Sequence, residues 1–120
     1  MPRFPALLLL ACTIAHADVK PGPSAARPAH QPRECEEAGD FIRNAALSRD
    51  NGMKKEVFIS RLEDDLATIR AFPPALRWFA RTRSDEAFLL EEARKVFDEP
   101  REAGEHRPAV VERCLGRSAE

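Results

Sequence analysis

The sequence predicts an all-α protein, a small bundle of four to five short helices closed by one disulfide. From about residue 34 onward, apolar residues recur at spacings of three and four, the period of an amphipathic helix. The chain contains no tyrosine and no sustained alternation of apolar and polar residues, so the pattern typical of strands is missing. Two cysteines, Cys35 and Cys114, lie near the two ends of this helical region.

The first residues have the pattern of an export signal. Arg3 precedes an apolar run from Ala6 to Ile14, and Ala15 and Ala17 place small side chains where signal peptidase requires them. The run is shorter than the roughly 20 residues that cross a bilayer. We therefore expect a signal peptide at 1–17, cleaved after Ala17, with no stable insertion into the membrane.

Two further features concern the segment before the helices. Residues 9–12 resemble a bacterial lipobox, although Leu10 is bulkier than the residue usual there, so a lipid anchor at Cys12 is the alternative to simple export. Residues 18–33 are rich in proline, alanine and arginine, with Val19 as their only large aliphatic side chain. Such a segment buries too little surface to order itself, so we expect a flexible tether. The helical domain is then expected at 34–117, followed by a tail at 118–120.

The first helix is expected to begin at about Glu34. Acidic side chains in its first turn are favoured by the helix dipole. The turn "RDNG" ends the helix because Gly52 can take the positive φ that follows many helix C-termini. Its buried stripe is expected to consist of Ala38, Phe41, Ile42, Ala45 and Arg49.

The second helix is expected to run from about Lys54 to Ala71. Pro73 and Pro74 end it, because the residue before a proline is displaced from the α region and proline lacks an N–H. The sequence "PALRWFARTR" after them predicts a third helix of about two turns that starts at Pro74. The apolar face of the second helix is expected to comprise Val57, Phe58, Leu62, Leu66 and Ile69.

Ser84 is the expected N-cap of a fourth helix, with acidic residues in the first turn. Pro100, Gly104 and Pro108 then interrupt the periodic pattern. A short fifth helix is expected to start near Pro108 and to end at Gly116. The buried faces of these two helices are expected to contain Leu89, Leu90, Ala93, Val96 and Phe97, and then Val110, Val111, Cys114 and Leu115.

Cys35 and Cys114 remain after removal of the signal. In an oxidising compartment such a pair is first a disulfide candidate, and a small domain benefits most from the cross-link. The alternative is a reactive thiol at Cys114, which Arg113 and Arg117 flank. Cys114 lies late in its helix, where the dipole disfavours a thiolate, so we expect a structural disulfide.

Composition and motifs argue against several function classes. The net charge is −1 with both signs interspersed, unlike the basic face of a nucleic-acid-binding protein. His16, His30 and His106 fall in the signal, the tether and a loop, so neither a zinc site nor a hydrolytic triad is expected. The glycines are scattered and form no phosphate-binding loop. We expect no metal, no cofactor and no nucleic-acid partner.

Carboxylates are the remaining catalytic candidates. The run "LEDDLA" places Glu63, Asp64 and Asp65 together, and Asp40 would face them if the first two helices formed a hairpin. A charge run on an amphipathic helix is usually a solvated face. A carboxylate-based enzyme is therefore kept only as an alternative.

The most distinctive candidate surface is "FPPALRWFARTR". It places Trp78 and Phe79 among Arg77, Arg81 and Arg83, and tryptophan and arginine are typical of interface hot spots. These five residues form the candidate partner-binding site, with another periplasmic protein as the partner. The alternative is that a ring fills the small core while the arginines stay in water, and we expect at least one ring in the core.

Four segments over about residues 35–115 stand out together: "CEEAGDFIRNAALSRDNGMKKEVF", "AFPPALRWF", "VFDEP" and "ERCL". In these segments the chain resembles a group of small exported proteobacterial proteins of unknown function. This resemblance implies the helical fold and the disulfide, but no activity. Lys54 stands where members of the group often have Ser or Thr as a helix N-cap. A looser likeness to periplasmic acid-stress chaperones extends to size, helicity and one disulfide.

Taken with the export signal, these features predict a periplasmic or secreted protein without enzymatic activity, acting as a binding or stress-protective module. An inhibitor of a periplasmic toxin or hydrolase is the second prediction.

Overall fold

The computed structural model describes residues 27–119, and within them the all-α prediction is confirmed. The helices are α1 (Pro32–Asp50), α2 (Lys55–Ile69), the one-turn 3-10 helix η1 (Pro74–Leu76), α3 (Arg83–Asp98) and α4 (Ala103–Leu115). The expected signal peptide at 1–17 and most of the expected tether lie outside the described residues. None of the described helices has the length and apolarity needed to cross a membrane.

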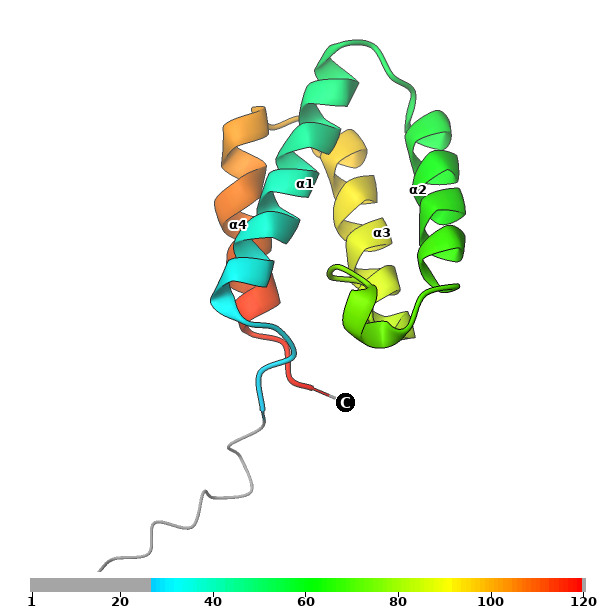
Figure 1. The fold of residues 1–120 in the computed structure, drawn as a ribbon. Coiled ribbons are helices and arrows are strands. Elements are labelled where there is room, and N and C mark those ends of the chain that lie inside the picture. The colour runs from blue at the N-terminus through cyan, green and yellow to red at the C-terminus, as the bar shows by residue number, and fades with distance from the viewer. Residues whose placement is uncertain (1–26, 120) are drawn as a thin grey trace, which may run out of the picture.

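The helices pack around α3. α1 lies against α4 and α3, and α2 packs on the other side of α3, so α1 and α2 flank it (Figure 1). The largest fully buried side chains come from α1, the segment after η1, and the other three helices: Ile42, Phe79, Leu66, Leu89, Val96 and Val110. The apolar stripes predicted for α1 and α3 therefore form the core. On α2 the inner side is Ile59, Leu62 and Leu66, whereas Val57 faces outward and is exposed.

The two ends of the domain are joined as predicted. A disulfide links Cys35 in the first turn of α1 to Cys114 in the last turn of α4, with the Cα atoms 5.5 Å apart and both residues buried. Beside it, Pro28 and Ser118 form an antiparallel bridge, and the Ala119 N–H donates to the Arg27 carbonyl at 2.7 Å. The chain therefore enters and leaves the bundle at the same end (Figure 1).

This bridge corrects two expected boundaries. Residues 27–33, expected to belong to the tether, are part of the folded domain, and so are Ser118 and Ala119 of the expected tail. α1 begins at Pro32 because a proline at the first helical position lacks an N–H that would have no partner there in any case. α2 begins one residue after Lys54, whose side chain makes no capping hydrogen bond.

α3 starts from a different cap than predicted. Thr82, not Ser84, is the N-cap, because its hydroxyl accepts the Asp85 N–H while the Asp85 carboxylate accepts the Thr82 N–H, a capping box. The third predicted helix is only the single turn η1, since Arg77 is extended and leaves the helical conformation. α4 starts at Ala103, so Pro108 lies inside the helix rather than at its start.

Gly39 sets the distance between α1 and α4. A Cβ placed there would lie 2.7 Å from Val111 Cγ2 and 3.1 Å from Arg107 Cγ, both on α4. Gly52 has the predicted positive φ, 93°, in the turn between α1 and α2. The close α1–α4 packing thus depends on a glycine inside a helix.

We expect Gly39→Ala to lower the free energy of unfolding by about 1 to 2 kcal/mol, because the overlap with the stiff Val111 side chain outweighs the better helix propensity of alanine. Gly104→Ala is the matched control, since a Cβ there meets nothing within 4 Å and alanine should be neutral or stabilising. Urea unfolding of both variants measures the difference. Equal free energies of unfolding for Gly39→Ala and Gly104→Ala would contradict the idea that stability depends on the close approach of α1 and α4 at Gly39.

Candidate functional site

The five candidate partner-binding residues are divided between core and surface. Phe79 is fully buried, so at least one ring lies in the core as predicted, and this residue is not available to a partner. Arg77 Nε donates to the Phe72 carbonyl at 2.7 Å, and its Nη2 donates to the Arg70 carbonyl at 3.0 Å. Arg77 therefore holds the loop after α2 in place.

Trp78 and Arg83 remain at the surface. Trp78 is 38% exposed, and its indole N–H donates to Glu37 Oε2 at 3.0 Å. Its ring lies 5.7 Å from that of Phe41, centroid to centroid. Arg83 is exposed and has no ion-pair partner among residues 27–119. Of the five candidate residues, Trp78 and Arg83 are therefore the two that are exposed, while Arg77 and Arg81 are half-buried.

Arg81 belongs to a buried cluster around His30. The His30 ring stacks on Phe79 with centroids 3.9 Å apart, and its side chain is almost fully buried. Its Nδ1 contacts Glu34 Oε2, and its Nε2 lies 2.8 Å from Asp85 Oδ1. Sequence reasoning missed this role because His30 follows a proline-rich stretch that was expected to be a tether.

Two arginines complete the His30 cluster, which we define as His30, Glu34, Arg81, Asp85 and Arg117. Arg81 Nη2 donates to Glu34 Oε2 at 2.6 Å, and Arg117 Nη1 donates to Asp85 Oδ1 at 3.0 Å. Burial by itself favours the neutral carboxylic acids. The hydrogen bonds from His30, together with Arg81 for Glu34 and Arg117 for Asp85, outweigh it and lower the pKa of both carboxyl groups.

The cluster is a structural junction. Both ring nitrogens of His30 are engaged by carboxylates, so neither is free to take a proton from a bound substrate. The remaining Asp85 oxygen accepts the backbone N–H groups of Arg81 and Thr82. The cluster therefore joins the start of α1 and the segment before it to the start of α3 and to the segment after α4.

His106 is also buried, on α4 rather than in the loop expected from the sequence. Burial lowers its pKa first, and the neighbouring Arg49 and Arg101 lower it further. Arg49 Nη1 donates to the Val96 carbonyl at 2.6 Å, and its Nη2 donates to the Arg101 carbonyl at 2.5 Å. Arg49 thus satisfies carbonyls at and beyond the end of α3, and His106 lies beside it.

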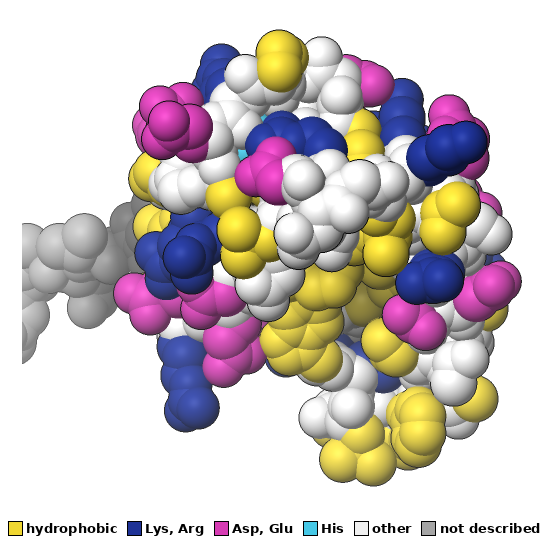
Figure 2. Space-filling model, turned by 90° about the horizontal axis from the view of Figure 1, so that it is seen from above, with side chains coloured by type: hydrophobic (Ala, Val, Ile, Leu, Met, Phe, Trp, Pro, Cys, Tyr) yellow, Lys and Arg dark blue, Asp and Glu magenta, His cyan; other side chains and the backbone are white. Residues whose placement is uncertain are grey.

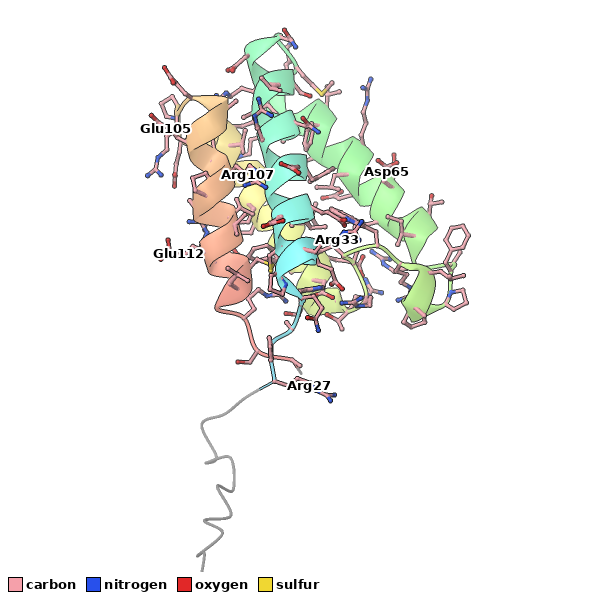
Figure 3. All side chains as sticks on the ribbon, turned by 60° about the vertical axis from the view of Figure 1, so that its left-hand side comes forward. Arg27, Arg33, Asp65, Glu105, Arg107 and Glu112 are labelled. Carbon is pink, nitrogen blue, oxygen red and sulfur yellow. A yellow bond between two sulfur atoms is a disulfide. The ribbon has the colours of Figure 1, made fainter. Side chains whose placement is uncertain are left out.

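The acidic run is a solvated face of α2. Glu63, Asp64 and Asp65 are exposed, and Asp65 is labelled on α2 in Figure 3. Asp40 does not face them, because its Oδ1 accepts from Arg107 Nε of α4 at 2.6 Å. The hairpin geometry considered for Asp40 is therefore wrong. Among residues 27–119, no group of three or more His, Cys, Asp or Glu side chains is placed to hold a metal ion.

Two adjoining hollows lie between α1 and α2 near the turn that connects them. A hollow of about 170 Å³ is joined through Met53 and Arg61 to a wider opening of about 540 Å³ near the Gly52 turn. We call the two together the α1–α2 groove. Figure 2 looks down on this end and shows hydrophobic side chains gathered in a depression with charged side chains around it. The lining residues are Phe41, Ser48, Asn51, Gly52, Met53, Lys54, Val57, Phe58, Arg61, Leu62 and Asp65.

Aromatic side chains form the floor of the groove. Phe58 of α2 lies 6.2 Å from Phe41 of α1 and 5.6 Å from Phe97 of α3, ring centroid to ring centroid. Because α1 and α2 each pack on α3, these rings span the space between them and stay partly exposed. The groove is therefore a consequence of how α2 attaches to the bundle.

The chain matches no known family model, and no curated protein and no solved structure resembles it significantly.

Proposed function

We propose that this chain is an exported, non-enzymatic binding module that receives an apolar segment of another protein in the α1–α2 groove. The observation that carries the proposal is the concave row of partly buried Phe41, Met53 and Phe58, beside the exposed Val57. A concave apolar surface with a few polar groups at its rim is the usual form of a binding site. Exposed apolar surface of this kind is otherwise unfavourable in water.

Export to the periplasm is supported by two independent features. The disulfide is consistent with an oxidising compartment, where such bonds persist. The pattern of residues 1–17 is that of an export signal, with cleavage after Ala17 and the lipidation of Cys12 as the alternative.

A non-enzymatic role is supported by the state of the titratable side chains. Carboxylates occupy both nitrogens of His30, and His106 is buried against Arg49. Glu63, Asp64 and Asp65 lie on an exposed helix face, which is the usual solvated side of an amphipathic helix. A carboxylate enzyme is the less favoured proposal.

The test uses the mature protein with its disulfide intact and a model client that was reduced and alkylated beforehand, so that it stays unfolded without reductant, with pull-down as the readout. We expect Val57→Arg to weaken capture by about tenfold, or about 1.4 kcal/mol, because it places a charge in the groove without disturbing the core. Met53→Arg, at the junction of the two hollows, should act in the same direction.

Leu76→Arg is the matched control, since Leu76 is an apolar side chain that is 71% exposed and lies outside the groove. If Leu76→Arg and Val57→Arg affect capture equally, or if the wild type captures no client, the proposal fails. A stress-protective protein should hold many unfolded clients. An inhibitor of a toxin or hydrolase should use the same groove for one folded partner, so the range of captured proteins separates the two roles.

A further inference from the structure

The rim of the α1–α2 groove carries charges of both signs at different places. Lys54 and Arg61 line the wide opening near the Gly52 turn, and Arg61 also borders the narrower hollow. Asp65, one helical turn beyond Arg61 on α2, is the only acidic side chain that lines either hollow. The groove is therefore basic at its open end, and an acidic side chain, Asp65, lines only the narrower hollow.

The three charged side chains at the rim of the groove, unlike several other charged side chains of the protein, form no ion pair within the described residues. Lys55, next to Lys54, pairs with Asp98 at 2.8 Å, and Arg107 pairs with Asp40 at 2.6 Å. Within residues 27–119, neither Lys54, Arg61 nor Asp65 has an oppositely charged atom within 4 Å. Three unpaired charges beside partly buried aromatic rings form a surface that an oppositely charged ligand complements.

We propose that the occupant of the groove is an amphipathic helix of a partner protein, acidic at one end and basic at the other. Its apolar face lies on Phe41, Met53 and Phe58, its carboxylate pairs with Lys54 and Arg61, and its basic side chain lies at Asp65. This inference rests on the proposed function, and it adds the chemistry and the orientation of the partner.

A helix fits this site better than an extended strand. A strand would need an exposed sheet edge, and residues 27–119 contain only one isolated bridge, already formed between Pro28 and Ser118. A helix laid on α1 and α2 would pack its ridges against both and cover the aromatic floor. The charges at its ends would then select one of its two directions in the groove.

The experiment selects binders from a displayed library of helix-forming peptides of about 15 residues, a length at which isolated helices begin to be stable. The wild-type mature protein is the target, and Val57→Asp, which places a repelling carboxylate in the apolar opening, is the counter-target that removes groove-independent binders. We expect the enriched peptides to carry apolar residues at spacings of three and four, with Asp or Glu near one end and Lys or Arg near the other.

Charge reversal then tests the orientation. Lys54→Glu with Arg61→Glu should weaken the selected peptides by about tenfold at low salt, and by less at high salt, because the charges at the rim are screened. The same double variant should favour peptides with Lys or Arg at that end. Arg43→Glu with Arg94→Glu is the matched control, because it changes the net charge equally at exposed positions outside the groove.

The possible results of these experiments separate the charge assignment from the proposed function. Enrichment of neutral or basic peptides that are insensitive to Lys54→Glu with Arg61→Glu would overturn the charge assignment but leave the apolar groove as a binding site. No enrichment over Val57→Asp would overturn the proposed function as well. Binding of anionic phosphatidylglycerol vesicles without any peptide enrichment would overturn both and assign the groove to a membrane surface.

Discussion

Reduction of the Cys35–Cys114 disulfide is expected to lower the free energy of unfolding by about 4 to 5 kcal/mol. The bond closes a loop with a sequence separation of 79 residues, so opening it restores a large conformational entropy to the unfolded chain. Small domains are stable by only about 5 to 15 kcal/mol. The reduced protein should therefore be close to unfolding at physiological temperature.

Urea unfolding with and without reductant measures this effect, and Cys35→Ala with Cys114→Ala gives the same loss without a reducing agent. Reductant should leave the double variant unchanged, which controls for effects elsewhere in the chain. Before reduction, neither cysteine should react with an alkylating reagent, because both are buried in the bond. Labelling of Cys114 in the unreduced mature protein would contradict the disulfide and restore the reactive-thiol interpretation.

Asp85→Asn is expected to lower the free energy of unfolding by about 3 kcal/mol or more. The substitution removes the charge that His30 and Arg117 face in a buried site, and an uncompensated buried charge is strongly destabilising. It also weakens the capping box at the start of α3. Asp40→Asn is the control, because the Asp40–Arg107 pair is exposed and such pairs contribute little.

Asp85→Asn should also change how the free energy of unfolding depends on pH. The pKa values of Glu34 and Asp85 are lowered in the fold from the ordinary 4.5 and 3.8, so their stabilisation is complete above these values. This stabilisation is lost as the pH falls from the ordinary carboxyl pKa values to the lower pKa values that Glu34 and Asp85 have in the folded state. The buried His106, whose pKa is lowered from 6.5, acts in the same direction, because acid charges it more readily in the unfolded chain.

Unfolding curves at several pH values between neutral and about pH 3 test this dependence. The free energy of unfolding of the wild type should fall steeply below the ordinary carboxyl pKa values. That of Asp85→Asn should be lower at neutral pH and should fall less over the same interval. Asp40→Asn should follow the wild-type curve. A wild-type curve that is flat in acid would contradict the ion pairs assigned to the His30 cluster.

Helix positions and the core followed from local patterns. The period of Ala38, Ile42 and Ala45, the turn at Gly52, and the prolines after α2 each act within a few residues, so the sequence predicted their effects. The errors came where two local signals competed. Thr82 and Ser84 are both acceptable N-caps, and only the reciprocal bonds with Asp85 decide between them.

The candidate site was harder to predict because it depends on contacts distant in sequence. The sequence predicted that one ring of "LRWFARTR" lies in the core, but not that this ring is Phe79, stacked on His30, nor that Arg77 and Arg81 hold loops and termini. A segment rich in arginine and aromatic residues has the same composition whether it forms an interface hot spot or a structural junction. What separates the two is burial, which no property of the local sequence specifies.

The sequence by itself determined the helical class, the main turns and the pairing of Cys35 with Cys114, because periodicity, proline, glycine and cysteine act locally or have few possible partners. Tertiary structure alone decided that His30 joins the two ends of the domain. It also decided that α2 attaches to the bundle through α3 and leaves a groove beside α1. The role of His30 and the attachment of α2 both depend on which helix faces pack together. The packing of the whole chain determines those faces, as in the close approach of α1 and α4 at Gly39.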